Sequence, residues 1–219
     1  METVPMAPLK LLVFGATGRT GREIVKQGLT SHHVTAFARD PADISLEHPH
    51  LRVVRGDVLD YDSVEAAVTG QDAVLVALGK RWPRKLFDRA TLTDGTRNIV
   101  RAMEAHGVKR LVCETSLEVG DSTGQLGWFF RYFVIPLFLR RAFRDKERQE
   151  QVIKQSSLAW VIVRPGVLTN GPRTGRYHAG FSNPAAHITA RISRADVADF
   201  MLEQVTSDAF LRRTPGLSY

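Results

Sequence analysis

The stretch VFGATGRTG, residues 13–21, carries glycines three residues apart at Gly15, Gly18 and Gly21. It follows the apolar run LKLLVF, which is typical of a strand covered on both faces. It leads into GREIVKQGLT, whose apolar residues have helical spacing. The first turn of a helix binds phosphate, because its N–H groups lack partners and the helix dipole is positive there. The stretch therefore predicts a phosphate-binding loop between a buried strand and a helix.

Each glycine has a separate task in such a loop. Gly15 allows the tight turn, Gly18 lets the backbone approach a diphosphate, and Gly21 lets the helix pack on the strand. The spacing G-x-x-G-x-x-G differs from the G-x-G-x-x-G dinucleotide fingerprint, so the prediction depends on the order of strand, loop and helix. A glycine-rich turn that holds no ligand is the alternative. We expect three polar neighbours to contact the dinucleotide as well: Thr17, Arg19 and Thr20.

Apolar runs and helical patterns alternate along the rest of the chain. Further strands are expected at residues 33–38, 51–57, 72–79, 108–116 and 158–166. Helices are expected at residues 61–70, 87–107 and 193–205, and in a long stretch that ends at Lys154 and is interrupted by Pro136. Repeated strand–helix units imply right-handed crossovers. The prediction is an α/β fold, Rossmann-like and doubly wound, with a mostly parallel sheet, helices on both faces and one domain over residues 1–219.

The end of the second strand bears on the choice of cofactor. A NAD-binding chain would carry Asp or Glu there to hold the ribose 2′-hydroxyl. This chain reads AFARD, with Arg39 before Asp40, and an arginine suits a 2′-phosphate. Arg19 could reach the same group. We therefore expect NADP(H), with NAD(H) held by Asp40 as the less favoured alternative.

Other strand ends complete the expected cofactor site. Asp57, with Val58 after it, is placed to face the adenine edge, although Asp57 could instead only cap the next helix. A small residue at Gly79 lets the cofactor ribose lie over the end of the fourth strand. All these positions are at the carboxyl ends of strands, where an open sheet binds its ligand. The same edge supplies the remaining expected contacts: Ala77, Leu78 and Thr115.

Composition limits the class of protein. The chain has 219 residues, 43% of them hydrophobic, and a net charge of +7. The single cysteine, Cys113, excludes an internal disulfide framework and fits a reducing, cytoplasmic setting. It lies in the apolar run RLVCETS, so we interpret it as a buried strand residue rather than a nucleophile. The basic charge is spread out, without a nucleic-acid-binding motif, so we expect no nucleic-acid partner.

Three further stretches bear on whether the chain contacts a membrane or a metal ion. The N-terminus lacks the apolar core of a signal peptide, and residues 126–139 are too short and too interrupted to span a bilayer. The segment 126–139 could be core, a lid over the nicotinamide or a partner surface. His48 and His50 stand in a loop with no second ligand cluster, so no metal site is expected.

Taken together, the motifs GATGRTG, FARDP, GDVLD, VALG, VCETS and VRPG resemble the atypical short-chain dehydrogenase/reductase superfamily, in family order across nearly the whole chain. Within it the chain is most similar to the NAD(P)H-binding group that includes biliverdin reductase B, a flavin reductase, and the NmrA-like proteins. ISRADVADFMLEQV and GPRTGRY support that group. The resemblance implies a nicotinamide that lies near the backbone of the RPG segment and the residue after it: Arg164, Pro165, Gly166 and Val167.

The resemblance also implies catalytic positions, and the chain departs from one of them. Ser116 stands where the superfamily has its serine, and Lys146 and Glu150 stand where a helix carries its lysine and a following acid. The superfamily's tyrosine would be residue 142, which is Ala142. Alternatively, Ser116 is a turn residue and the Lys146–Glu150 pair lies on a helix surface. Tyr132 or Tyr177 could reach the pocket by another route.

These features lead to three functional hypotheses. The first is an oxidoreductase that passes hydride from NADPH to a flat, conjugated small molecule such as a flavin, quinone or tetrapyrrole, which needs little help from an enzyme acid. The second is a non-catalytic NADP(H)-sensing regulatory protein of NmrA type. The third is an epimerase- or dehydratase-like enzyme. We expect a monomer or weak dimer.

Overall fold

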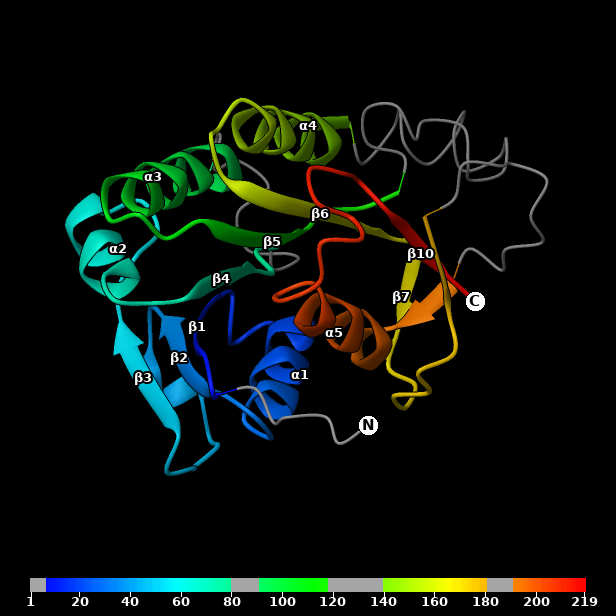
Figure 1. The fold of residues 1–219 in the computed structure, drawn as a ribbon, viewed down its shortest axis with the longest axis horizontal. Helices are drawn as coiled ribbons and strands as arrows, with labels where there is room; N and C mark the ends of the chain where they lie inside the picture. The colour runs from blue at the N-terminus through cyan, green and yellow to red at the C-terminus, as the bar shows by residue number, and fades with distance from the viewer. Residues whose placement is uncertain (1–6, 80–90, 118–139, 181–190) are drawn as a thin grey trace.

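The fold is seen in a computed structural model that describes residues 7–79, 91–117, 140–180 and 191–219. Its centre is an eight-stranded sheet with the strand order β3-β2-β1-β4-β5-β6-β10-β8 (Figure 1). Neighbouring strands are parallel, except that β8 runs antiparallel to β10. The eight strands are β1 (Lys10–Phe14), β2 (His33–Ala38), β3 (Leu51–Arg55), β4 (Ala73–Val76), β5 (Arg110–Glu114), β6 (Ala159–Pro165), β8 (His178–Ala179) and β10 (Gly216–Ser218). A separate parallel pair is formed by β7 (Val167–Thr169) and β9 (Arg191–Ser193).

Helices cover both faces of the sheet, as Figure 1 shows. One face carries α1 (Arg19–Gly28) and α5 (Arg194–Glu203), which pack against each other. The opposite face carries α2 (Tyr61–Val68), α3 (Thr91–Ala105) and α4 (Arg140–Lys154). A single 3-10 turn, η1 (Pro41–Asp43), stands between β2 and β3. The doubly wound, mostly parallel α/β fold expected from the sequence is therefore confirmed.

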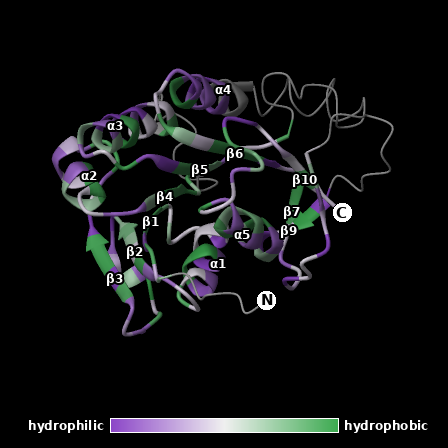
Figure 2. Cartoon of the chain, viewed as in Figure 1, coloured by the Kyte–Doolittle hydropathy of each residue, from purple (hydrophilic) through white to green (hydrophobic). Residues whose placement is uncertain are grey.

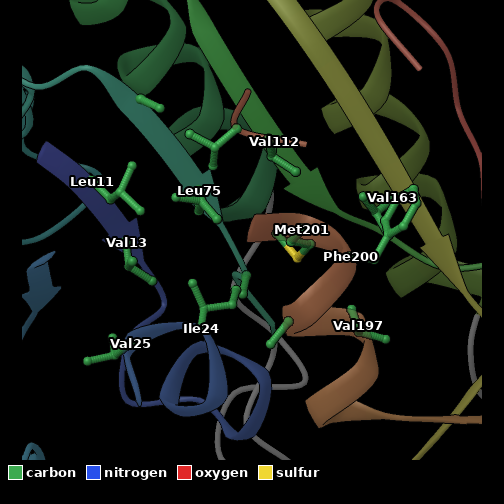
Figure 3. Close-up of a cluster of buried hydrophobic side chains, with 14 of the residues drawn as sticks. Leu11, Val13, Ile24, Val25, Leu75, Val112, Val163, Val197, Phe200 and Met201 are labelled. Atoms are coloured by element: carbon green, nitrogen blue, oxygen red, sulfur yellow. The ribbon is translucent and has the colours of Figure 1, made fainter. Parts of the chain in front are cut away.

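The apolar strand runs are buried because helices lie on both sides of them. In β1, Leu11 and Val13 pack toward α1 and α5, while Leu12 and Phe14 pack toward α2 and α3, and all four are fully buried. Full burial of such a side chain contributes about 1.5–3 kcal/mol. Figure 3 shows the first cluster, in which side chains of α1 and α5 meet those of β1, β4, β5 and β6. Figure 2 shows the complementary pattern along the outer helices, where hydrophilic residues alternate with hydrophobic ones.

The order of the strands determines where a ligand can bind. β1 pairs with both β2 and β4, and Phe14 lies opposite Phe37 on one side and Val76 on the other. The chain therefore winds outward in both directions from β1. The carboxyl end of β1 is the topological switch point, which is where open α/β sheets bind ligands.

Some elements differ from the sequence-based expectations. The strands β7, β8, β9 and β10 were not predicted, and each has only two or three residues. Such short strands carry no periodic signal, and their position is determined by pairing with distant segments. The apolar stretch 126–139 and the interruption at Pro136 lie outside the described residues. None of the helices that the structure describes is long and apolar enough to cross a membrane.

Candidate functional site

Two of the three loop glycines are required by the packing of the backbone. Gly15 has a φ of +81°, and a Cβ atom there would lie 2.4 Å from the carbonyl oxygen of Ala77. A Cβ atom at Gly21 would lie 2.1 Å from the carbonyl oxygen of Gly15. These distances leave no room for a side chain. They fit the tight turn and the close helix–strand contact expected at these two positions.

Gly18 is different, because its own packing does not exclude a side chain. It has a φ of −70° and a ψ of 163°, which any residue adopts. Its nearest contact for a Cβ atom would be the carbonyl oxygen of Gly15 at 3.1 Å, and Gly18 is exposed. A glycine here therefore keeps the surface of the loop open to something that approaches it from outside.

The N-terminus of α1 is also open. Gly18 is its N-cap and supplies no side-chain hydrogen bond, and the first turn holds no acidic residue. Arg19 is exposed and makes no hydrogen bond or ion pair within the described residues, while Thr17 is half-buried. Thr20 is buried and points inward, where its hydroxyl donates to Oε1 of Glu114 at 3.2 Å. The loop thus presents free N–H groups and a free guanidinium to an anion.

At the end of β2 the two candidate residues have different surroundings. The carboxylate of Asp40 accepts a hydrogen bond from the backbone N–H of Ala42 at 3.1 Å and caps the 3-10 turn η1. Arg39 is exposed and makes no hydrogen bond or ion pair among the residues described. The cation at this strand end is available to a ligand, and the carboxylate has a structural partner.

After β3, both candidate residues have local partners. Oδ1 of Asp57 accepts a hydrogen bond from the backbone N–H of Leu59 at 3.0 Å, which forms an Asx-type turn. The N-cap of α2 is Asp60, so Asp57 is not the helix cap that the sequence left as an alternative. The carbonyl of Val58 accepts from the side-chain amide of Asn98 at 3.0 Å, which fixes this turn against α3.

The ends of β4 and β6 are held by backbone pairing. The N–H of Ala77 donates to the carbonyl of Phe14 at 2.9 Å, beyond which Leu78 is half-buried and Gly79 exposed. The carbonyl of Pro165 accepts from Leu117, and the N–H of Gly166 donates to Leu217, both at 3.0 Å. Among the expected nicotinamide contacts, the exposed one is the side chain of Val167.

The structure brings the expected serine and lysine together at the end of β5. Nζ of Lys146 donates a hydrogen bond to the carbonyl oxygen of Thr115, so the ammonium lies beside the backbone that leads into Ser116. Both Lys146 and Ser116 are half-buried. Burial lowers the pKa of Lys146, and the nearby acid Glu114 opposes that shift. Residue 142, where the superfamily has its tyrosine, lies one turn earlier in α4 and is an alanine.

Glu150 is part of a buried ion pair rather than a surface pair with Lys146. Its carboxylate accepts two hydrogen bonds from the guanidinium of Arg164, at 3.0 and 2.6 Å, and one from the hydroxyl of Thr115 at 2.8 Å. Lys154, one turn further along α4, lies 3.2 Å away. Glu150 and Arg164 are each 2% exposed, so the alternative of a solvated pair on a helix surface is wrong.

Tyr177 comes directly before β8, and its side chain packs against α5. Its hydroxyl donates to Oδ2 of Asp199 at 3.2 Å, and its ring packs edge-on against Phe200. Burial and the neighbouring carboxylate of Asp199 raise the pKa of Tyr177. Tyr132, the other tyrosine considered from the sequence, lies outside the described residues.

Two charged residues at this edge were not singled out from the sequence. Glu114, the last residue of β5, is 7% exposed, and burial raises its pKa although Lys146, Thr20 and Arg194 oppose the shift. Arg194 is the first residue of α5, and its charge interacts with those of Glu114 and Arg19. An acid inside a buried strand run is the signal that marks Glu114. Arg194 follows the N-cap Ser193 and has no such signal.

The remaining candidates are a cysteine, a group of histidines and a cavity. Cys113 is fully buried, as expected, and burial raises the pKa of its thiol. The ring of His50 contacts the rings of His33 and His48, but nowhere in the described ranges do three His, Cys, Asp or Glu side chains form a group that could hold a metal ion. A cavity of about 180 Å³ flanks α1 and is lined by residues such as Val25 and Ile44.

Comparison with known proteins agrees with this geometry. The chain matches the model of the NAD(P)H-binding family over residues 15–208. An uncharacterised chloroplastic protein of Arabidopsis thaliana is 36% identical over 178 residues, which cover 76% of this chain and 61% of that protein. The sugar epimerase YhfK of Bacillus subtilis, itself uncharacterised, is 26% identical over 196 residues, which cover 87% of this chain and 85% of that protein.

Solved structures with the same fold support the comparison. The anaerobilin reductase ChuY of Escherichia coli O157:H7 has a TM-score of 0.78 and 25% identity, with 95% of this chain and 96% of that chain covered. A short-chain dehydrogenase/reductase of Veillonella parvula, solved with NADP, has a TM-score of 0.77 and 19% identity, with 98% and 95% covered. The family match confirms the resemblance to the NAD(P)H-binding group, and these structures show the same fold.

Proposed function

This chain belongs to the NAD(P)H-binding family, and we propose from that premise that it is an NADPH-dependent oxidoreductase acting on a flat, conjugated acceptor such as a flavin, quinone or tetrapyrrole. NADPH supplies a hydride when it is bound. The residues of this chain bind the cofactor, orient the acceptor beside it and keep water from the reacting atoms. The ChuY relative is an anaerobilin reductase, and a bilin is a conjugated tetrapyrrole.

The preference for NADPH over NADH rests on the two residues after β2. Arg39 is exposed and has no protein partner in the described part of the chain, whereas the carboxylate of Asp40 already caps η1. A guanidinium fits the planar geometry of a phosphate and forms charge-assisted hydrogen bonds with it. Arg39 would hold the 2′-phosphate, while the glycine loop with Thr17 and Arg19 would hold the diphosphate. Thr20 would contribute only its backbone N–H, because its hydroxyl donates to Glu114.

The observation that carries the choice of acceptor is that none of the described tyrosines lies beside Lys146. Each tyrosine hydroxyl that the structure describes donates to a carboxylate elsewhere: Tyr61 to Glu65, Tyr177 to Asp199 and Tyr219 to Asp196. Residue 142, one turn before Lys146, is alanine. A positioned general acid contributes about a hundredfold to ten-thousandfold to a rate. Ser116 and Lys146 would therefore position the acceptor, and we assign no proton transfer to Tyr177 or to Glu150.

The acceptor follows from this lack of an acid. A simple ketone becomes an alkoxide as it takes up hydride, and this product needs a proton as it forms. A flavin or quinone spreads the added charge over its rings, and solvent can supply the proton afterwards. Catalysis then depends mostly on holding two flat molecules in the reacting geometry.

The test is NADPH oxidation with a panel of acceptors. We expect saturable oxidation with FMN or a quinone, little with an unactivated ketone or aldehyde, and no loss of rate tied to a pKa near that of tyrosine. Rapid, saturable reduction of a plain ketone would contradict the proposal, because it requires an acid. Tight NADPH binding with no turnover would favour a sensor of NmrA type. Interconversion of a sugar without net NADPH loss would favour an epimerase, as the name of the YhfK relative suggests.

The setting of the protein is part of the same proposal. The single, buried Cys113 fits a reducing compartment, so we keep the cytoplasm as the expected location, although the Arabidopsis relative is chloroplastic. One domain over residues 1–219, a monomer or weak dimer and the absence of a nucleic-acid partner stay predictions from the sequence.

A further inference from the structure

Arg194 lies at the same edge of the sheet as the phosphate loop although it comes from the opposite end of the sequence. It is the first residue of α5, directly after the N-cap Ser193. The helix is fixed against α1, where the side-chain amide of Gln27 donates to the carbonyl of Ala195 at 2.9 Å. Arg194 itself donates to the carbonyl oxygen of Thr169, which follows the carboxyl end of β6, so the start of α5 lies at the carboxyl edge of the sheet, where α1 also begins.

The guanidinium of Arg194 is held at one of its nitrogens only. Nη1 donates to the carbonyl oxygen of Thr169 at 3.0 Å and to Oδ1 of Asn170 at 2.6 Å. Nε and Nη2 make no hydrogen bond within the described residues, and Arg194 forms no ion pair there within 4.0 Å. An arginine has five N–H donors in a fixed plane, so this side chain is oriented but keeps donors for a ligand.

The charges around Arg194 are unbalanced without a ligand. Burial and, after it, the charge of Arg19 lower the pKa of Arg194, while the charge of Glu114 opposes the shift. Glu114 is itself shared, because it accepts a hydrogen bond from Thr20 and also interacts with Lys146. An anion bound between Arg19 and Arg194 would offset the repulsion between the two positive charges.

We propose that Arg194 binds the diphosphate of the dinucleotide from the α5 side, opposite Arg19 and the N-terminus of α1. The inference rests on the proposed function and adds a residue to its site. The anion would accept hydrogen bonds from the free nitrogens of Arg194 and from the loop N–H groups. The bonds to Thr169 and Asn170 fix the guanidinium before the ligand arrives, which reduces the entropy lost on binding.

The experiment measures binding to the full chain by calorimetry, with no acceptor present. Three ligands separate the phosphates: NADPH, NADH and adenosine 2′-monophosphate, which has no 5′-phosphate. Arg194→Gln should weaken NADPH and NADH alike, by about tenfold to a hundredfold, as expected for the loss of a charge-assisted hydrogen bond. Adenosine 2′-monophosphate should bind as before. Arg52→Gln, which removes an exposed arginine in the middle of β3, is the control for net charge and should change none of the three.

The outcomes separate this inference from the proposed function. If the natural protein binds neither dinucleotide, both fail. If it binds them and Arg194→Gln binds all three ligands unchanged, only the role of Arg194 is wrong. An equal loss for adenosine 2′-monophosphate also overturns it, because the effect would then be structural or would lie at the 2′-phosphate. If Arg194→Gln does not fold, Arg194→Lys decides: it should fold and lose part of the dinucleotide affinity, and full affinity would contradict the proposal.

Discussion

The two sides of the strand-end edge treat charge in opposite ways. On the α4 side, Glu150 and Arg164 are buried together, form two hydrogen bonds and are joined by Thr115. On the α1 and α5 side, Arg19 and Arg39 are exposed without partners in the described part of the chain. The resemblance to a known family singles out residues on both sides. The difference teaches that only unpartnered charges are available to a ligand, whereas the paired ones hold the edge in shape.

The paired side should respond to mutation through stability. Removing one partner of a buried ion pair leaves an uncompensated charge, which costs about 3–5 kcal/mol. The open side should respond through binding, because an exposed arginine with no partner contributes little to the folded state. Substitutions on the two sides can therefore break or sharpen this comparison.

The largest expected effect is on the paired side. Glu150→Ala should lower the free energy of unfolding by about 3–5 kcal/mol, because the buried guanidinium of Arg164 loses the carboxylate to which it donates two hydrogen bonds. Urea unfolding measures it. The matched control is Glu147→Ala, an exposed acid one turn earlier in the same helix, which should change stability by less than about 0.5 kcal/mol. Equal effects of the two substitutions would show that the buried pair is not what stabilises this side.

The next effect is on the open side, at Gly18. Gly18→Val should weaken both NADPH and NADH by more than about a hundredfold, or about 2.7 kcal/mol, because a side chain would stand between backbone and diphosphate. The unfolding temperature of the ligand-free protein should move little, since the backbone angles at Gly18 suit any residue.

Gly21→Ala is the matched contrast to Gly18→Val. Its Cβ atom would lie 2.1 Å from the carbonyl oxygen of Gly15, so this smaller change should cost stability instead. Near-native NADPH affinity in Gly18→Val would mean that the loop holds something else or nothing.

The smallest effect concerns the choice of cofactor. Arg39→Ala should weaken NADPH by about tenfold to a hundredfold, the value of a charge-assisted hydrogen bond, and leave NADH almost unchanged. Titration of both cofactors into both proteins measures it, with Arg52→Ala as a control for net charge. An equal loss for NADH would remove Arg39 from the 2′-phosphate and reopen the assignment of Asp40.

Much of the fold could be predicted because it depends on local patterns. Strands such as β1 and β6 are nearly continuous apolar runs, and Gly15 and Gly21 mark a turn in which backbone atoms of Ala77 and Gly15 leave no room for a side chain. The α4 side of the strand-end edge was harder to predict. Glu150 and Arg164 are fourteen residues apart, on a helix and a strand, so their pairing exists only in the folded chain.

The open side shows the same limit. Arg194 comes to the strand edge with α5, which packs on α1, and that packing depends on apolar residues from both ends of the sequence. Sequence reasoning therefore found the residues that act through backbone shape and missed a side chain that acts through its neighbours. Four short strands were missed for a related reason, since two or three residues hold their place only by pairing with a distant segment.

The buried thiol of Cys113 can report local opening of the structure through its rate of alkylation. It is the one cysteine in the sequence, it is fully buried, and it contacts Gln149 of α4 through its sulfur at 3.6 Å. A thiol reagent can reach it only when α4 separates from β5, so the rate of alkylation measures how often the two elements separate. The same strand ends one residue later in Glu114 and leads into Thr115. A ligand bound at that strand end would lower the rate of alkylation without touching the sulfur. The rate would therefore report how much of the site is occupied.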